Sequence, residues 1–347
     1  MTPGDLEARL ARAARRLRPP GLAAARVDAS GPAAVAVTGV RVRGGDVPVR
    51  ADDPWHIGSC TKAFTAALYA RLVARGAAAW GTPLPDLLPD LAPGMDRGWG
   101  AVTIDALLRH RAGLPGDLAP AVLAAAHADP RPPAAQRAEA AARALADPPL
   151  RPGAFAYSNL GYVVAGAVIE AVAGRPWEDA LRDDLLGPLG IRSAGVGAPP
   201  GGPWGHAPRW GAAGRGRPVP PDAPDADNPR VMDPAGGLHM TLADWGRFVA
   251  EFLDGGATVL DEDAVARLLA PPAAGPAVAM GWVHPPPRAR GALRGVGIGH
   301  QGSNLRWVAS AFLDDDRRRA ALVVTNDGRA RMRTGTARLA ADVLSAA

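Results

Sequence analysis

The segment 59–76 constrains the fold more than any other part of the chain, because it reads as one almost uniformly apolar helix. Phe64, Leu68 and Leu72 recur at every fourth position, which is the spacing of one helical face, and alanines fill many of the positions between them. Gly76 follows as a C-terminal capping residue. A helix that is apolar on all sides must be covered on all sides. We therefore predict that this helix lies at the centre of the protein.

The start of this helix carries Lys62, which is the only lysine of the chain. The chain has 38 arginines. An arginine guanidinium stays protonated in proteins, but a desolvated lysine amine can lose its proton and act as a base. Ser59 stands three residues earlier and shares one helical face with Lys62. A serine hydroxyl beside an amine at a helix N-terminus is a candidate nucleophile.

The composition excludes several classes of function. The chain has 347 residues, 48% hydrophobic and 21% charged residues, and a formal net charge of +5. The many arginines are balanced by 34 acidic residues, and outside the first helix the only basic run is 317–319, so we expect no nucleic-acid-binding face, which would need concentrated basic charge. The single cysteine, Cys60, excludes an internal disulfide, and no Cys/His spacing indicates zinc, so Cys60 reads as a small buried hydrophobe.

The N-terminal residues 1–20 do not resemble a secretory leader. Arginines occur throughout this stretch and no apolar core segment interrupts them. No stretch of the chain is long and apolar enough to span a membrane. From these features we expect a cytoplasmic protein without membrane attachment.

Two clusters of strand patterns stand at the two ends of the chain, with helical patterns between them. We predict the strands and helices from apolar periodicity and turn residues. The predicted strands are 22–27, 33–42, 47–50, 278–283, 294–298, 307–313 and 320–325. The first predicted helix opens with the capping sequence 2–5 and runs through Leu17 to the prolines at 19 and 20. The other predicted helices are 103–111, 133–145, 160–172, 176–186, 242–252 and 330–344.

This order predicts an α+β fold in which both chain ends build one antiparallel sheet flanked by N- and C-terminal helices. We assign residues 1–85 and 275–347 to this sheet domain and residues 86–274 to a mainly helical insert, with the active site in the cleft between them. The segment 195–228 is rich in Gly and Pro around Trp204, His206 and Trp210. We read it as a packed loop near the cleft.

Two further motifs carry side chains that could complete a catalytic site around Ser59 and Lys62. Tyr157 and Asn159 stand two residues apart just before a predicted helix, and His300-Gln301-Gly302-Ser303 follows a predicted edge strand. Together with Ser59-Cys60-Thr61-Lys62, these motifs resemble the S-x-x-K, Y-x-N and K-T-G/H-x-G motifs of the β-lactamase-like serine hydrolases. That superfamily includes class C β-lactamases, D-Ala-D-Ala carboxypeptidases, D-aminopeptidases and family VIII esterases.

The neighbouring stretches support the same resemblance. They occur in the order of the family between residues 21 and 326, and they are 55–58, 107–115, 157–166 and 234–238. The resemblance implies an antiparallel sheet flanked by helices, an all-helical second domain, and an acyl-enzyme formed on Ser59.

The resemblance also implies roles for the other motif residues. Tyr157 is the candidate general base for acylation and acid for the leaving group, because the positive charge of Lys62 can favour its phenolate. Lys62 would either tune Tyr157 in this way or share the proton, and the sequence does not separate the two. Asn159 would contact Lys62 and the acyl group of the substrate. The backbone N–H groups of Ser59 and Ser303 would form the oxyanion hole. His300, Gln301 and Gly302 complete the expected substrate-binding set, with Gly302 letting the substrate lie against the strand.

His300 stands where penicillin-recognising members have lysine, and this difference bears on the substrate. Imidazole can donate a hydrogen bond but is mostly uncharged at neutral pH, which disfavours an anionic ligand. We therefore expect hydrolysis of a small ester, amide or peptide of esterase or D-amino-acid peptidase type. A β-lactamase or D-Ala-D-Ala carboxypeptidase and a catalytically silent ligand-binding homologue are the alternatives. No cofactor or metal is expected, and the sequence does not give the oligomeric state.

Overall fold

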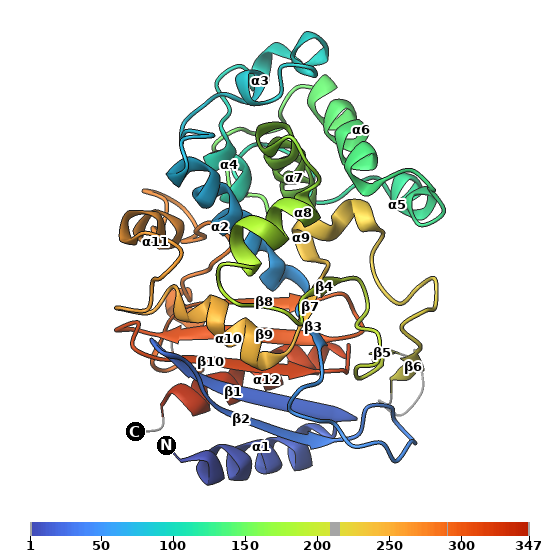
Figure 1. Cartoon of the computed structure of the whole chain (residues 1–347), viewed down its shortest axis with the longest axis vertical. Helices are drawn as coiled ribbons and strands as arrows, with labels where there is room; N and C mark the ends of the chain where they lie inside the picture. The colour runs from blue at the N-terminus through green and yellow to red at the C-terminus, as the bar shows by residue number, and fades with distance from the viewer. Residues whose placement is uncertain (1, 209–215, 290, 346–347) are drawn as a thin grey trace.

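A five-stranded antiparallel sheet, built from both ends of the chain, forms one half of the molecule (Figure 1). The computed structural model describes residues 2–208, 216–289 and 291–345. The strand order is β2-β1-β10-β9-β8, so that the N-terminal hairpin pairs with the C-terminal strands through β1 and β10. The strands are β1 (Gly21–Asp28), β2 (Gly31–Gly39), β8 (Val296–Ser303), β9 (Val308–Asp314) and β10 (Ala320–Thr325).

Helices cover both faces of this sheet. The helices α1 (Pro3–Leu17) and α12 (Ala330–Leu344) pack together on one face, where Leu6, Leu10 and Val323 join one apolar cluster. On the opposite face α10 (Leu242–Ala250) packs on β1 and β2. Successive side chains of a strand point to opposite faces of the sheet. In β1, Leu22 and Ala24 therefore join the cluster under α1 and α12, whereas Ala23 and Ala25 join the larger apolar core on the other face, so β1 is buried on both sides.

The other half of the molecule is helical, and α2 (Thr61–Ala74) runs through its centre (Figure 1). Every residue of α2 from Thr61 to Ala70 is buried, and so is Leu72. The predicted central position of this helix is therefore confirmed. The surrounding elements are α3 (Leu84–Leu87), η2 (Ala92–Gly94), η3 (Arg97–Trp99), α4 (Ile104–Leu108), α5 (Pro120–Ala126), α6 (Pro133–Ala146), α7 (Asn159–Ala173), α8 (Trp177–Leu181), η4 (Arg182–Leu186) and α11 (Glu262–Leu269).

Shorter elements connect the two halves. A small sheet joins β3 (Trp55–His56), β7 (Leu238–Met240) and β4 (Gly195–Val196), and the turns η5 (Arg230–Met232) and α9 (Asp233–Gly236) precede β7. The expected packed loop contains the hairpin β5 (Gly205–Ala207) and β6 (Arg217–Val219). His206 in this hairpin is fully buried and donates from Nδ1 to the carbonyl of Asn326 at 2.7 Å. Trp210 lies outside the described residues.

The α+β fold with an antiparallel sheet is confirmed, and four local predictions are corrected. Residues 47–50 and 278–283 form only isolated bridges, from Pro48 to Val40 and from Val283 to Val278 and Gly299, and Gly281, with a φ of 77°, turns the second segment back on itself. The predicted helix 176–186 ends its α-helical part at Leu181 and continues as the π-helical turn η4. The motif 300–303 does not follow a strand but forms the end of the edge strand β8. The domain boundaries at 85/86 and 274/275 stay a prediction, and α10, inside the second range, packs on the sheet.

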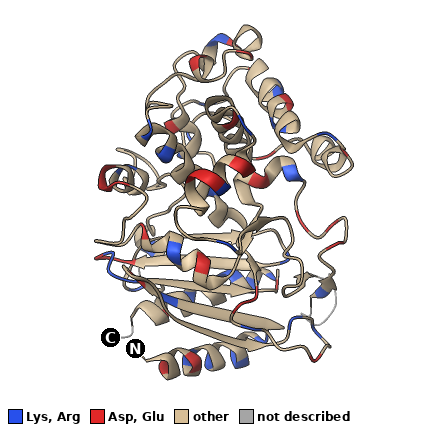
Figure 2. Cartoon of the chain, viewed as in Figure 1, with Lys and Arg blue, Asp and Glu red and all other residues tan. Residues whose placement is uncertain are grey.

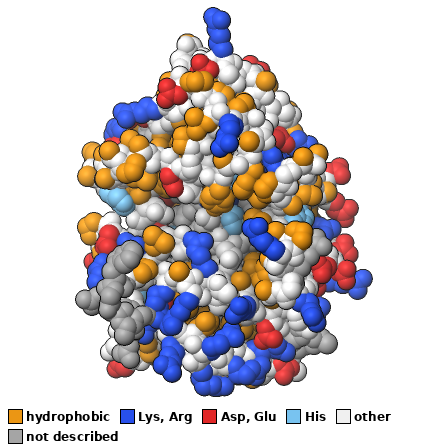
Figure 3. All heavy atoms as spheres, turned by 180° about the vertical axis from the view of Figure 1, so that it is seen from behind, with side chains coloured by type: hydrophobic (Ala, Val, Ile, Leu, Met, Phe, Trp, Pro, Cys, Tyr) orange, Lys and Arg blue, Asp and Glu red, His pale blue; other side chains and the backbone are white. Residues whose placement is uncertain are grey.

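Charged residues of both signs are interspersed along the helices and loops (Figure 2). On the face turned away in Figure 1, apolar side chains gather over the helical half, and basic side chains with acidic ones among them cover the half that holds the sheet (Figure 3). Within the described residues, no helix combines the length and apolar character needed to cross a bilayer.

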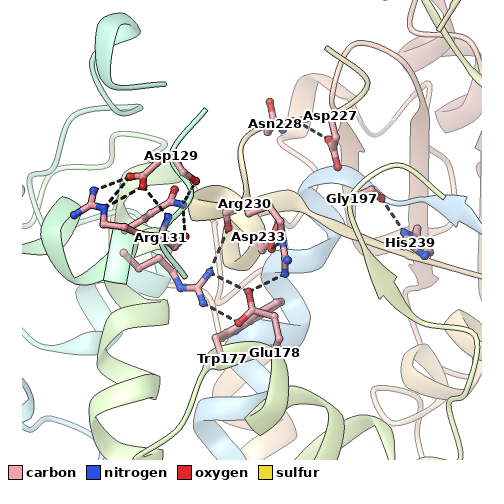
Figure 4. A network of polar contacts seen from close by, with 12 residues as sticks. Asp129, Arg131, Trp177, Glu178, Gly197, Asp227, Asn228, Arg230, Asp233 and His239 are labelled. Carbon is pink, nitrogen blue, oxygen red and sulfur yellow. Dashed lines mark hydrogen bonds and ion pairs between the residues drawn. The ribbon is translucent and has the colours of Figure 1, made fainter. Parts of the chain in front are cut away.

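One charged group is fully buried between helices. Arg137 of α6 has no exposed surface and binds Glu170 of α7 at 2.5 Å and Glu178 of α8 at 2.8 Å. Glu178 also contacts Arg230, which pairs with the buried Asp233 at the start of α9 (Figure 4). This network therefore ties α6, α7 and α8 to the short turn α9.

We predict that Arg137→Ala lowers the free energy of unfolding by about 3–5 kcal/mol, because it removes the cation that Glu170 pairs with and leaves Glu178 with only its longer contact to Arg230. The matched control is Arg143→Ala on the same helix, whose pair with Glu139 is exposed and should contribute about 0.3–0.5 kcal/mol. Urea unfolding of both variants measures the difference. Equal losses would contradict the structural role of the Arg137 network.

Candidate active site

Ser59 lies in the 3-10 turn η1 (Gly58–Cys60), which leads directly into α2. The turn exists because Gly58 adopts a positive φ of 53°, a conformation that favours glycine. Ser59 is partly exposed and lines a pocket, whereas Lys62, one turn further on, is fully buried. The predicted pairing of the two side chains is present, since Lys62 Nζ lies 3.4 Å from Ser59 Oγ.

The amine of Lys62 meets three oxygen atoms from three segments. In addition to Ser59 Oγ, Nζ donates to Asn159 Oδ1 at 2.7 Å and to the carbonyl of Ala235 at 2.6 Å. The two shorter contacts are to amide and carbonyl oxygens, which can only accept hydrogen bonds. A neutral amine has two N–H bonds and one lone pair. If the two N–H bonds point to Asn159 and Ala235, the lone pair points toward Ser59 Oγ.

The surroundings of Lys62 favour that neutral form. Burial lowers the pKa of Lys62 from its ordinary value to about 7, and the negative charge of Asp117 raises this pKa against the effect of burial. A substantial fraction of the amine is therefore unprotonated near neutral pH.

Tyr157 stands beside this pair, on the loop before α7. Its ring stacks on His110 with centroids 4.3 Å apart, and Lys62 Nζ lies 5.1 Å from the ring centroid. Tyr157 is 40% exposed over the whole residue, yet burial around its hydroxyl raises its pKa to about 12, and a hydrogen bond with Ser59 lowers the pKa against that effect. The hydroxyl is thus protonated at neutral pH, which differs from the expectation that Lys62 would stabilise a phenolate.

Two glycines bring the backbone N–H groups of Ser59 and Ser303 together. A Cβ atom on Gly302 would lie 1.9 Å from the carbonyl oxygen of Ile57 and 2.7 Å from Ser59 N. A Cβ atom on Gly58 would lie 2.4 Å from Ser303 N. These close approaches require a glycine at position 302 whether or not substrate lies there, so the expected room for substrate at Gly302 stays a prediction. The missing Cβ lets β8 lie against the turn that carries Ser59.

His300 is brought close to the site but its hydrogen-bonding role differs from the expectation. It is buried, and its Nδ1 lies 2.6 Å from the carbonyl of Gly281. Burial lowers the pKa of His300 to about 4, so the ring is neutral at pH 7. Because a carbonyl only accepts, Nδ1 carries the hydrogen and Nε2 is an acceptor. His300 in this state cannot donate to a substrate carboxylate.

Gln301 does not reach the site with its side chain. Its Nε2 donates to Ser310 Oγ at 2.9 Å and to the carbonyl of Arg333 in α12 at 2.8 Å. Gln301 therefore points to the face of the sheet that α12 covers, opposite to His300. His110, which stacks on Tyr157, is buried and accepts a hydrogen bond from Ser158 N at 3.0 Å.

A pocket of about 330 Å³ opens beside Ser59. Asn159 and Ser303, both predicted site residues, line it. The other lining residues are Asp117, Leu123, Ala124, His127, Asn228, Pro229, Met232, Ala235, Gly236, Asn304 and Leu305. The polar surroundings include Asn228, which lies beside Asp227 in Figure 4.

The sequence did not single out Asp117 or the carbonyl of Ala235. Asp117 accepts a hydrogen bond from Asn159 Nδ2 at 3.0 Å, so Asn159 connects it to Lys62. Asp117 lies two residues beyond the 107–115 stretch. An acidic residue so close to a stretch shared with the family was the one sequence feature that could have identified it. The Ala235 contact comes from the backbone, which side-chain motifs do not reveal.

Known proteins resemble this chain over most of its length. Penicillin-binding protein 4 of Amycolatopsis lactamdurans is 32% identical over 224 residues, which is 63% of this chain and 56% of that protein, so the match spans little more than half of the relative. The crystal structure of SurE is 27% identical to this chain, with a TM-score of 0.78 over 97% of this chain and 75% of SurE. A crystal structure of SurE with D-Leu is 25% identical, with a TM-score of 0.73 over 96% of this chain and 73% of that one.

A β-lactamase/D-alanine carboxypeptidase from Pseudomonas syringae shares the fold, with 17% identity and a TM-score of 0.76 over 99% of this chain and all of that one. The family model described as Beta-lactamase matches residues 6–345. The resemblance drawn from the three motifs is thereby confirmed, and the chain belongs to the Beta-lactamase family.

Proposed function

We propose that this protein is a serine hydrolase that forms an acyl-enzyme on Ser59 and hydrolyses a small ester or amide. The observation that carries the proposal is the contact between Ser59 Oγ and Lys62 Nζ, in which the buried amine has its other hydrogen bonds directed to Asn159 and Ala235. A neutral amine held in this way presents its lone pair to the serine hydroxyl. It is the arrangement of a base beside a nucleophile.

In the proposed acylation, Ser59 Oγ attacks the substrate carbonyl carbon while Lys62 Nζ accepts the hydroxyl proton. The N–H groups of Ser59 and Ser303 stabilise the oxyanion of the tetrahedral intermediate. Tyr157, protonated at neutral pH, passes a proton to the departing alcohol or amine and is reprotonated from Lys62. Water then attacks the acyl-enzyme with the same groups, which releases the acid and restores Ser59.

The substrate class follows from the polarity of the site. Neutral His300 has only an acceptor nitrogen left, which disfavours recognition of a carboxylate. The D-Leu held by SurE, a protein 25% identical to this chain, supports a substrate of D-amino-acid type. Esterase or D-amino-acid peptidase activity is therefore the leading proposal.

A β-lactamase or D-Ala-D-Ala carboxypeptidase is the second candidate. The observation that favours it is the 32% identity to a protein named as penicillin-binding. A catalytically silent homologue is disfavoured, because the paired Ser59 and Lys62 retain the geometry of a base and a nucleophile.

We predict that the protein hydrolyses a short-chain p-nitrophenyl ester and leaves a penicillin in the same tube intact, and that Ser59→Ala abolishes ester hydrolysis. Absorbance at the nitrophenolate band and intact-protein mass spectrometry follow both reactions. Opening of the penicillin, or a lasting adduct on Ser59, would favour the second candidate. No reaction and no labelling by a fluorophosphonate would favour a silent homologue.

We further predict that kcat/KM for the ester rises with pH through about 7 and levels off above it, because Lys62 acts as a base only after losing its proton. Lys62→Arg should lower kcat/KM by about 10²–10⁴-fold, since a guanidinium keeps its proton. Thermal melting of the variant checks that it is folded. A folded Lys62→Arg variant with near wild-type activity would refute the role of Lys62 as the base.

A further inference from the structure

Asp117 is an exposed carboxylate on the wall of the Ser59 pocket. It is held in place by one hydrogen bond, from Asn159 Nδ2 to Oδ2 at 3.0 Å. A carboxylate offers about four acceptor positions, so most of its acceptor capacity remains available to a ligand in the pocket. The group that holds it, Asn159, is also bound to Lys62, which places Asp117 next to the reacting atoms.

The charge of Asp117 is not balanced by a neighbouring cation in the pocket. The chain has 38 arginines, yet no arginine and no lysine is among the described residues that line this pocket. Lys62 lies on the far side of the Asn159 amide, and its hydrogen bonds are directed to protein oxygens. His127 is the one other lining residue with a titratable side chain, apart from the hydroxyls of Ser59 and Ser303.

Apolar side chains from three different segments complete the same pocket. Leu123 comes from α5, Met232 from η5, and Leu305 from the turn after β8, where the residue is 57% exposed. A ligand that fits these walls has an apolar group next to a positive charge. An acyl group with a free amino group and a hydrocarbon side chain has both features.

We propose that Asp117 binds a protonated amino group on the acyl part of the substrate, so that the enzyme prefers aminoacyl esters, aminoacyl amides or peptides with a free N-terminus. This inference rests on the proposed acyl-enzyme chemistry at Ser59 and narrows its substrate class. An ammonium group gains a charge-assisted hydrogen bond from Asp117, whereas an N-acylated or anionic group does not.

The test compares three p-nitrophenyl esters that differ at one position: alanyl with a free amine (each enantiomer), N-acetylalanyl and propionyl. Wild-type protein, Asp117→Asn and Asp90→Asn are measured at pH 7, and Ser59→Ala supplies the background rate. Asp117→Asn is nearly isosteric, and Asp90→Asn makes the same change of net charge at an exposed position away from the pocket. The ratio of kcat/KM between alanyl and propionyl esters is the readout, because effects on the shared catalytic steps cancel in it.

We expect wild-type protein and Asp90→Asn to prefer one alanyl ester over the propionyl and N-acetylalanyl esters by about 10–100-fold, the range for a hydrogen bond to a charged group. In Asp117→Asn the preference should fall to within a few-fold of unity. Equal rates on all three esters in the wild type, or an unchanged preference in Asp117→Asn, would overturn the role of Asp117 while leaving Ser59 hydrolysis standing. Failure to hydrolyse any ester would instead overturn the proposed function.

Discussion

The structure depends on the burial of one amine. Lys62 has no exposed surface, and an amine in that position requires oxygen partners to offset its lost hydration. These partners come from η1 (Ser59), from the start of α7 (Asn159) and from α9 (Ala235). The apolar helix α2 holds the amine in place, and the hydrogen bonds of the amine fix the relative positions of the three segments around Ser59.

The electrostatics of the cleft follow from the same constraint. Burial lowers the pKa of both Lys62 and His300, and it raises the pKa of Tyr157. All three groups can therefore be neutral near pH 7, so Asp117 dominates the charge of the pocket. A site of this kind is suited to a base-assisted attack on a neutral carbonyl and is poorly suited to holding an anionic ligand.

Much of this arrangement could be predicted from the sequence, because periodicity and spacing report on whole elements. The uniform apolar pattern of α2 predicted its central position, and the S-x-x-K spacing predicted the contact of Ser59 with Lys62. Patterns inside an element were less informative. Because His300-Gln301-Gly302-Ser303 was placed after a strand rather than within β8, the opposite directions of His300 and Gln301 were missed. The requirement for a glycine at position 302 comes from the close approach of the Ile57 carbonyl, which is distant in sequence.

The single lysine allows a direct measurement of the central claim. Protein labelled with lysine carrying ¹³C at Cε has one Lys side-chain resonance, and its chemical shift can be followed by NMR between pH 5 and pH 11, within the range where the protein stays folded. The account predicts a midpoint near 7, because burial lowers the pKa of Lys62 to about 7. A midpoint near the ordinary lysine value of about 10.4 would contradict it, since Lys62 would then be an ammonium at neutral pH and could not be the base.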